Sequence, residues 1–262
     1  MIYLTDDFEE NRINPVTGQE WDSSWIALML TDDEKFRLFC GSVNGGVYTV
    51  KVSRILHENW QFAVGDFIGF NEDDGKNIIL AMTKEEYAAA SGFYRGHSYN
   101  EPFLRDSEPQ VLVHSTPLES WEAIRRDGCL KCWSRLKAEG AVDEEKPIGN
   151  SLGDPADFAD YIMLGSGVFG EIVVNSKQRG EILSDENAEY LTGARLYFDA
   201  AKIARSGLLV RDGCHLKVKD KLPLDNYLIW AATYENVGLE SRISTPAIFA
   251  KLADSRFRDL NK

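Results

Sequence analysis

A short apolar strand that runs directly into a helix is the feature that most constrains this chain. Residues 111–113 are Val-Leu-Val, and such a run with β-branched members is typical of a buried strand. Thr116 can cap a helix, Pro117 fits the first helical position, and apolar residues then recur at helical spacing as far as Gly128. The sequence therefore predicts a strand that turns at once into a helix.

Polar residues stand where this strand gives way to the helix. They are His114, Ser115 and Thr116. A neutral imidazole offers one hydrogen-bond donor and one acceptor, so His114 can anchor a ligand at this point. A histidine on an apolar strand can also have a purely structural role, and the local pattern alone leaves both interpretations open.

The size and charge of the chain limit its partners. It has 262 residues, 44% of them hydrophobic, which is enough for one large domain or two modest ones. The net charge is −13, and residues 1–90 hold 7 Lys and Arg against 16 Asp and Glu. Long nucleic acids are bound mainly through Lys and Arg, so the first part is a poor partner for them. The rest is closer to balance, which leaves room for a pocket that holds one phosphate or a dinucleotide.

The sequence points to a cytoplasmic protein with no membrane partner. No apolar run is long enough to span a bilayer, and the first residues lack the basic start and apolar core of a signal peptide. The four cysteines would stay reduced in the cytoplasm. Cys129 and Cys132 could bind zinc together with Cys214 and His215, but joint tetrahedral ligation by an adjacent pair is awkward, so we expect no metal.

Strand patterns dominate residues 1–90. Apolar and aromatic runs separated by turn signals predict strands at 25–31, 36–40, 47–52, 60–70 and 77–82. A tight hairpin is expected at 44–46, and a capped helix should begin at Thr83. Five short strands suggest a small barrel or a curled sheet. We predict an α+β chain in which a small all-β, barrel-like domain of unknown role spans residues 1–90 and a second domain spans 91–262.

The second domain mixes both kinds of element. Strand patterns cover 168–174, 194–198 and 223–230, and a hairpin with an Asp-Gly turn covers 208–218. Asp199 should begin a helix that Gly207 ends, and Pro246 fits the first turn of a terminal helix. Residues 157–164 predict a helical turn that leads into a strand.

Three segments, taken in order, resemble the RNA 2′-phosphotransferases of the ADP-ribosyltransferase superfamily. Gly96-His97-Ser98, preceded by Arg95, is similar to that family's Gly-His-Ser, which also follows an Arg. Residues 113–128 resemble its Tyr-His-Gly-Thr unit and the helix ending in Glu-Gly-Leu. Residues 196–228 resemble its closing stretch, which has an Asp-Ala helix, a strand, an Asn-Gly turn and a Pro before a Tyr-hydrophobic pair. The resemblance covers about residues 93–230.

The resemblance implies a split, mostly antiparallel-sheet fold of the ADP-ribosyltransferase type, with NAD as cosubstrate held bent in a cleft. It implies that His114 bonds an NAD ribose and that the backbone at Ser115 holds the nicotinamide amide, with Thr116 beside it. Tyr161 would lie over the nicotinamide ring, and an aromatic face against a cationic ring is favourable.

The resemblance also implies a phosphate grip made of Arg95, His97 and Arg211, because a guanidinium can bond a phosphate through two N–H groups. Glu181 is the candidate for a catalytic acid. By themselves, Arg95 and Arg211 could equally be surface charges, and Tyr161 could be a core residue. Ser115 replaces the family's usual Gly, and residues 1–90 do not resemble the winged-helix lobe that supplies an Arg-His pair in that family.

These features predict an NAD-dependent ADP-ribosyl- or phosphotransferase. It would cleave the nicotinamide glycosidic bond and transfer ADP-ribose to a phosphorylated or nucleic-acid acceptor, such as an RNA end or a 2′-phosphate. Two alternatives remain open at this point. One is a toxin-like or regulatory transferase that modifies a protein. The other is a non-catalytic protein that binds NAD, ADP-ribose or a partner.

Overall fold

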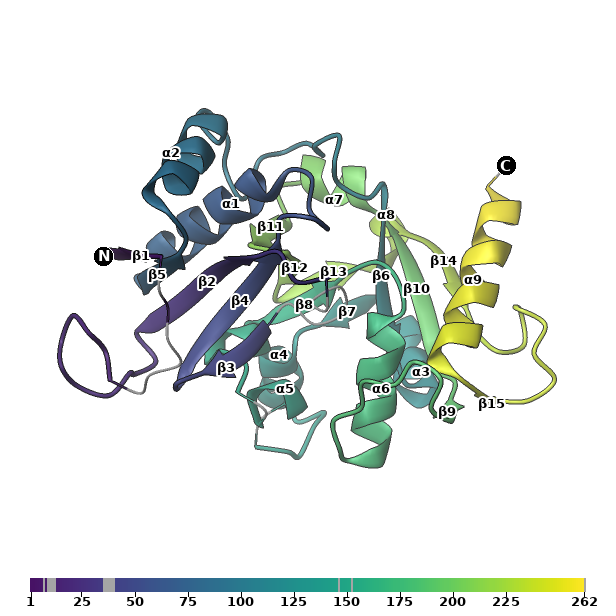
Figure 1. Cartoon of the computed structure of the whole chain (residues 1–262). Coiled ribbons are helices and arrows are strands. Elements are labelled where there is room, and N and C mark those ends of the chain that lie inside the picture. The colour runs from purple at the N-terminus through teal and green to yellow at the C-terminus, as the bar shows by residue number, and fades with distance from the viewer. Residues whose placement is uncertain (7, 9–12, 35–40, 146, 152, 262) are drawn as a thin grey trace. The chain divides into compact units, whose positions relative to one another are not determined.

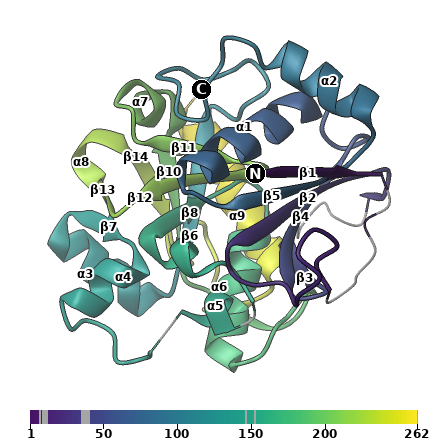
Figure 2. The same cartoon turned by 90° about the vertical axis from the view of Figure 1, so that its left-hand side faces the viewer.

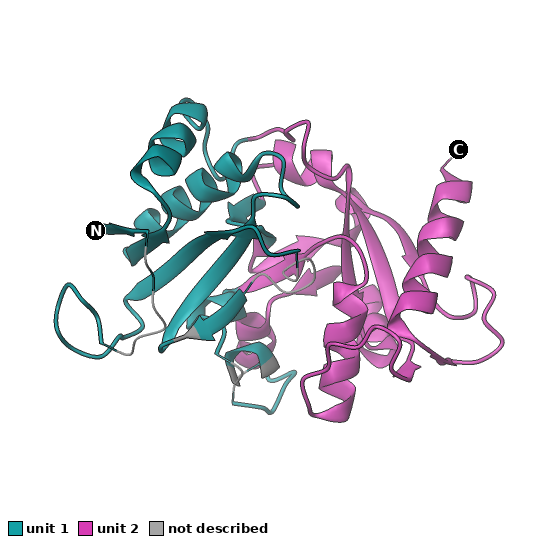
Figure 3. Cartoon of the chain, viewed as in Figure 1, with its two compact units in different colours: residues 1–101, 140–160, 209–217 teal, residues 102–139, 161–208, 218–262 magenta. Residues whose placement is uncertain are grey.

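The computed structural model describes residues 1–6, 8, 13–34, 41–145, 147–151 and 153–261, and they form two compact units (Figure 3). Unit 1 consists of residues 1–101, 140–160 and 209–217, and unit 2 consists of residues 102–139, 161–208 and 218–262. Both contain helices and strands, so the mixed α+β class is confirmed. Unit 1 includes all of residues 1–90, and the domain boundary near residue 90 stays a prediction.

Unit 1 is built on a five-stranded sheet with the order β1-β5-β2-β4-β3 (Figure 1). Strands β1 (Ile2–Thr5), β5 (Asn77–Ala81), β2 (Trp25–Thr31) and β4 (Val47–Ser53) are parallel, and β3 (Gly41–Asn44) is antiparallel to β4. Parallel strands are covered on both faces and therefore read as continuous apolar runs, as residues 26–28 do here. The predicted barrel is wrong, because the described strands form an open sheet with β1 and β3 at its edges.

Helix α1 (Trp60–Asp73) occupies the stretch that we predicted as a strand over 60–70. Its buried apolar side chains have helical spacing, and they are Val64, Phe67 and Phe70. Gly65 and Gly69 lie one turn apart, where the rings of Tyr94 and Tyr99 approach the helix. The glycines and aromatic residues suggested a strand. In the structure this segment is a helix that connects β4 to β5, and its two glycines leave room for the two tyrosine rings. Figures 1 and 2 show α1 along one face of the sheet, with helix α2 beyond it.

Local signals in unit 1 are confirmed where they were specific. Helix α2 (Lys84–Phe93) begins with a capping box between Thr83 and Glu86. The hairpin turn lies between β3 and β4, with Asn44 opposite Val47. Residues 35–40 lie outside the described residues, and with them the strand predicted at 36–40. A later hairpin has strands β11 (Leu209–Asp212) and β12 (His215–Lys219). Unit 1 also contains α5 (Ile148–Ser151) and the short 3-10 helix η2 (Ala156–Asp160).

Unit 2 is built on an antiparallel sheet with the order β14-β10-β6. Its strands are β6 (Val111–Thr116), β10 (Ala194–Asp199) and β14 (Leu228–Ala232). Ser115 is paired with Arg195, and His114 is paired with Leu196. Because side chains alternate along a strand, Ser115 and Arg195 share one face of this sheet, and His114 lies on the other.

Two helices cover the face that carries Ser115. Helix α6 (Phe169–Arg179) occupies the stretch predicted as a strand over 168–174, so that prediction is wrong. Its β-branched residues suggested a strand, but Gly180 ends it in the left-handed conformation (φ 69°), with Lys177 and Arg179 in its last turn. Helix α9 (Pro246–Leu260) has Pro246 in its first turn, as the sequence predicted, and the Thr245 side chain caps it by accepting from the Ile248 N–H.

The strand–helix unit at β6 is also confirmed, with one difference. Helix α3 (Leu118–Asp127) ends at Gly128, whose φ is 68°. Thr116 stays within β6 and Pro117 occupies the N-cap position without a side-chain hydrogen bond, so the predicted capping by Thr116 is wrong. Asp199 caps α7 (Ala200–Arg205) as predicted.

The remaining elements of unit 2 are short. β7 (Cys129–Lys131) pairs with β13 (Lys221–Pro223), and β9 (Tyr190–Leu191) pairs with β15 (Ile243–Ser244). Helix α4 (Trp133–Ala138) follows β7. η2 leads into β8 (Tyr161–Leu164), which confirms the helical turn and strand predicted over 157–164. The strand predicted over 223–230 is divided between α8 (Leu224–Tyr227) and β14.

The close packing of Tyr94 on Gly65 of α1 gives a prediction about stability. Gly65→Ala should lower the free energy of unfolding by about 1–3 kcal/mol, because the new methyl group overlaps the Tyr94 ring. Gly92→Ala on α2 is the matched control, with nothing within 4 Å of its Cβ position, and it should raise that free energy by about 0.5–1 kcal/mol. Urea denaturation measures both. Equal effects of the two substitutions would contradict the packing described here.

Candidate functional site

His114 lies near the end of β6 with its ring held in one orientation. The Nδ1 atom is 3.0 Å from the carbonyl oxygen of Met163 in β8. Burial lowers the pKa of His114 from its ordinary value of 6.5, although the Met163 bond opposes this, so the ring is neutral near pH 7. A carbonyl oxygen only accepts, so Nδ1 carries the proton and donates it. The Nε2 atom is then the unprotonated nitrogen, which can accept a hydrogen bond from a hydroxyl group.

The next two residues of β6 are in close contact with other parts of unit 2. The Ser115 hydroxyl donates to Glu171 Oε1 of α6 over 2.6 Å. Thr116 is buried, and Gly193 comes so close to its carbonyl oxygen that a side chain on Gly193 would overlap it. β6 is therefore held in place at Ser115 and Thr116, the two residues after His114.

A buried ionic network starts at Ser115. Glu171 and Arg195 are 0% and 1% exposed in their side chains, and Arg195 NH1 lies 2.8 Å from Glu171 Oε2. Arg195 also donates to the carboxylate of Asp254 on α9 and to the main-chain oxygen of Gly167. Tyr197 donates its hydroxyl to Asp254 over 2.7 Å. The network thus joins β6, β10, α6 and α9.

Charge pairing and burial act against each other in this network. Burial raises the pKa of Glu171, while the Arg195 charge and the Ser115 hydrogen bond pull it down and reduce the rise. Burial would lower the pKa of Arg195, but the charges of Glu171 and Asp254 outweigh it, so that pKa is raised. Burial raises the pKa of the Tyr197 hydroxyl as well. Arg195 therefore keeps its charge, and the other members are arranged around it.

The other predicted residues of unit 2 lie apart from this network in the sequence. Tyr161 begins β8, is half-buried, and has Lys219 Nζ 5.8 Å from the centre of its ring. Glu181 is exposed and lies just beyond Gly180, the C-cap of α6. The strand predicted over 168–174 is that helix, so Glu181 follows a helix and not a strand.

The predicted phosphate grip lies in unit 1. Arg95 is exposed in the loop after α2. His97 and Arg211 both contact the buried Glu101, because His97 Nδ1 is 3.0 Å from a Glu101 carboxylate oxygen and Arg211 NH1 donates to the Glu101 main-chain oxygen over 3.3 Å. Arg211 is a buried side chain of β11, so it is not a surface charge. The structure thus brings His97 and Arg211 together through Glu101.

A glycine pattern opens α6, and the sequence interpretation missed it. Gly165, Gly167 and Gly170 have the spacing G-x-G-x-x-G between β8 and α6. Gly167 has φ 75°, and a Cβ atom at Gly170 would lie 2.7 Å from the Ser115 hydroxyl oxygen, so glycine lets α6 pack closely on β6. This spacing marks dinucleotide sites when it lies in a βαβ unit. In the described residues the strand after α6 is β9, which pairs antiparallel with β15, so the pattern carries no ligand assignment here.

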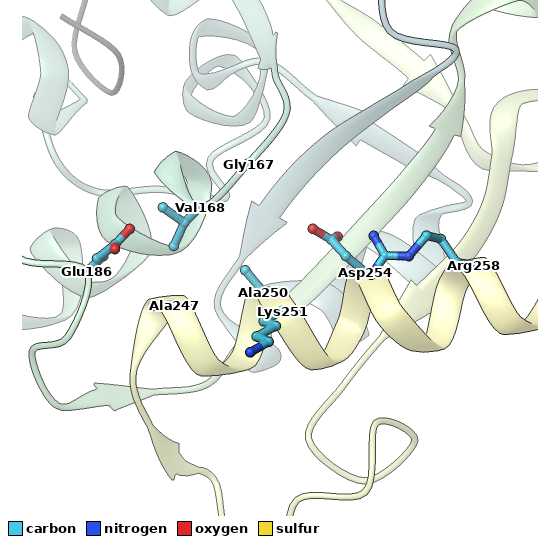
Figure 4. Close-up of a pocket in the computed structure, with 8 residues that line it drawn as sticks. All are labelled: Gly167, Val168, Glu186, Ala247, Ala250, Lys251, Asp254 and Arg258. Atoms are coloured by element: carbon cyan, nitrogen blue, oxygen red, sulfur yellow. The ribbon is translucent and has the colours of Figure 1, made fainter. Parts of the chain in front are cut away.

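An open pocket of about 300 Å³ lies between the start of α6 and α9 (Figure 4). The residues that line it are Gly167, Val168, Glu186, Ala247, Ala250, Lys251, Asp254 and Arg258. Asp254 belongs to both this pocket and the buried network. The pocket presents charges of both signs, so it selects neither an anion nor a cation by charge alone.

The residues of the network could not be found from sequence motifs. Glu171 and Arg195 stand within two segments that were predicted as strands, and Asp254 stands within the predicted terminal helix. The one signal was Arg195 inside the apolar run Ala194–Phe198. Its partners come from three other segments, so only the folded chain shows them together.

Comparisons with protein-family models, with curated proteins and with solved structures found no match. Within the residues that the structure describes, no helix combines the length and apolar character needed to cross a membrane. The same residues contain no group of three or more His, Cys, Asp or Glu side chains that could hold a metal ion.

The buried network predicts a large cost for removing Arg195. Arg195→Met should lower the free energy of unfolding by about 3–5 kcal/mol at pH 7, because Glu171 is then buried without its partner. The loss should shrink as the pH falls, since protonated Glu171 carries no charge. Arg126→Met is the control, because the Arg126 side chain is 78% exposed, and a surface change of this kind alters stability by about 0.5 kcal/mol or less. A loss as small as that of the control would refute the network's role.

Proposed function

We propose that this protein is an NAD-dependent ADP-ribosyl- or phosphotransferase similar to the RNA 2′-phosphotransferases. The observation that carries the proposal is the state of His114. Its Nδ1 is occupied by Met163, its lowered pKa keeps it neutral, and its Nε2 is an acceptor. A ribose hydroxyl is a donor of the matching kind. The role that the resemblance implies for His114 therefore agrees with the protonation that its surroundings impose.

The order of elements also supports the proposal. β6 and α3 are followed by β10, the Asp199-capped α7, the hairpin β11–β12, and Pro223 before α8 and β14. The resemblance implies the same succession of elements over residues 93–230. The antiparallel pairing of β6, β10 and β14 fits the mostly antiparallel sheet that this family implies.

The chemistry would need positioning more than acid catalysis. The bond between the nicotinamide nitrogen and the ribose carbon breaks, and the ring leaves as a neutral molecule with the bonding electron pair. An oxygen of the acceptor, such as a phosphate, then bonds to that ribose carbon. Holding the two reactants in register can supply about 7–11 kcal/mol. His114 would fix the ribose, and Tyr161 would face the nicotinamide.

One observation favours the non-catalytic alternative. The side chain of Ser115 is already bonded to Glu171, and Gly170 of α6 packs against Ser115. The family's usual Gly has no side chain that could be held in this way, so Ser115 is a departure from the catalytic family. A protein that binds NAD or ADP-ribose without turning it over is therefore the second candidate.

Release of nicotinamide from NAD tests the proposal directly. The wild-type protein should release it, and His114→Ala should lower kcat/KM about five- to tenfold through the lost hydrogen bond. His57→Ala is the matched control, because this half-buried histidine lies in a turn of unit 1, and it should leave kcat/KM unchanged.

The outcomes separate the candidates. NAD binding in calorimetry without nicotinamide release would favour the non-catalytic protein. Release with label from NAD on a protein, and none on RNA, would favour the protein-modifying transferase. Absence of both binding and release would end the proposal.

A further inference from the structure

We propose that Glu171 is a positioning residue, which acts through Ser115 to hold the main chain of β6 in the conformation that binds NAD. The inference rests on the proposed function, since it concerns the same strand. The contact that carries it is the 2.6 Å hydrogen bond from the Ser115 hydroxyl to Glu171, one residue from His114.

Glu171 is well suited to hold a strand in place. Its side chain is fully buried, and each of its two oxygens has its own partner, Ser115 for one and Arg195 for the other. Arg195 is itself fixed by Asp254 and by the main-chain oxygen of Gly167. A carboxylate held in this way cannot rotate without leaving a buried charge unpaired, so the Ser115 hydroxyl meets a rigid acceptor.

The geometry separates this role from direct contact with the ligand. Ser115 and Arg195 are register partners, and their side chains bond to α6 and α9 on one face of the sheet. His114 lies on the opposite face by strand alternation, with its Nδ1 on Met163. Glu171 therefore acts on the strand from the face away from His114. It is a support for the binding strand and does not contact the NAD that His114 would hold.

Gly170 strengthens this coupling. Only a residue without a side chain lets the start of α6 approach Ser115 so closely, since a Cβ atom there would lie 2.7 Å from the Ser115 oxygen. Helix and strand thus meet at two consecutive helix residues, Gly170 and Glu171. We therefore expect a change in the Ser115–Glu171 hydrogen bond to alter the main-chain conformation of residues 114–116.

The test uses Ser115→Ala, which removes the hydroxyl and leaves the Glu171–Arg195 pair in place. The KM for NAD in nicotinamide release, and the Kd for NAD in calorimetry, should rise about tenfold, with kcat within about twofold of the wild type. Amide hydrogen exchange in the peptide that covers residues 111–117 should also become about tenfold faster.

Ser176→Ala is the matched control. Ser176 is a buried serine of the same helix, whose hydroxyl donates to the Ile172 main-chain oxygen over 2.8 Å and has no hydrogen bond to β6. It should lose a similar amount of stability, yet leave KM, Kd and exchange in residues 111–117 unchanged. If Ser115→Ala and Ser176→Ala have the same effect, or if neither changes Kd and exchange, the proposal is overturned.

The two proposals fail in distinguishable ways. A wild-type protein that neither binds NAD nor releases nicotinamide overturns the proposed function, and with it the ligand named here. The exchange measurement still decides, in that case, whether Glu171 holds the strand. A wild-type protein that binds NAD, with a Ser115→Ala variant that binds it equally well, overturns the positioning role alone.

Discussion

The ion pair between Arg195 and Glu171 is the interaction on which unit 2 depends most. Both side chains are withdrawn from water, and a buried charge is tolerated only when it is paired and hydrogen-bonded. Arg195 lies on the middle strand of the sheet, and its partners come from α6, α9 and the loop before α6. Satisfying this one guanidinium therefore fixes the positions of two helices on one face of the sheet.

The two faces of this sheet differ in the contacts that their polar residues make. On the face with Ser115, Arg195 and Tyr197, these three side chains have hydrogen-bond partners within unit 2. The opposite face carries His114, whose ring is oriented by Met163 and left neutral by burial. A rigid strand with an unprotonated ring nitrogen is a suitable platform for a ribose hydroxyl. The proposed function would use the rigidity of one face to hold the residue on the other face that recognises the ligand.

The sequence predicted those elements whose signals are local. Thr83 and Asp199 cap their helices because a side-chain oxygen needs only the next turn to find its N–H, and Gly128 ends a helix because of its own φ. α1 and α6 were mistaken for strands because glycines and β-branched residues disfavour isolated helices. The glycines at 65 and 170 are instead positions where other parts of the chain pack closely on these helices. The barrel prediction was wrong because α1 was not expected. This helix connects β4 to β5, and β5 then lies parallel between β1 and β2 in an open sheet. The pairing of residues 115, 171, 195 and 254 is non-local, and its one trace in the sequence is the charged Arg195 within an apolar strand.

The protonation of His114 is the central claim, and NMR of the protein with isotope-labelled histidine measures it directly. The account predicts a neutral ring at pH 7 with the proton on Nδ1, and a selective shift of the Nε2 resonance when ADP-ribose is added. His114→Asn assigns the signal. A proton on Nε2, or a spectrum that ADP-ribose leaves unchanged, would contradict the account.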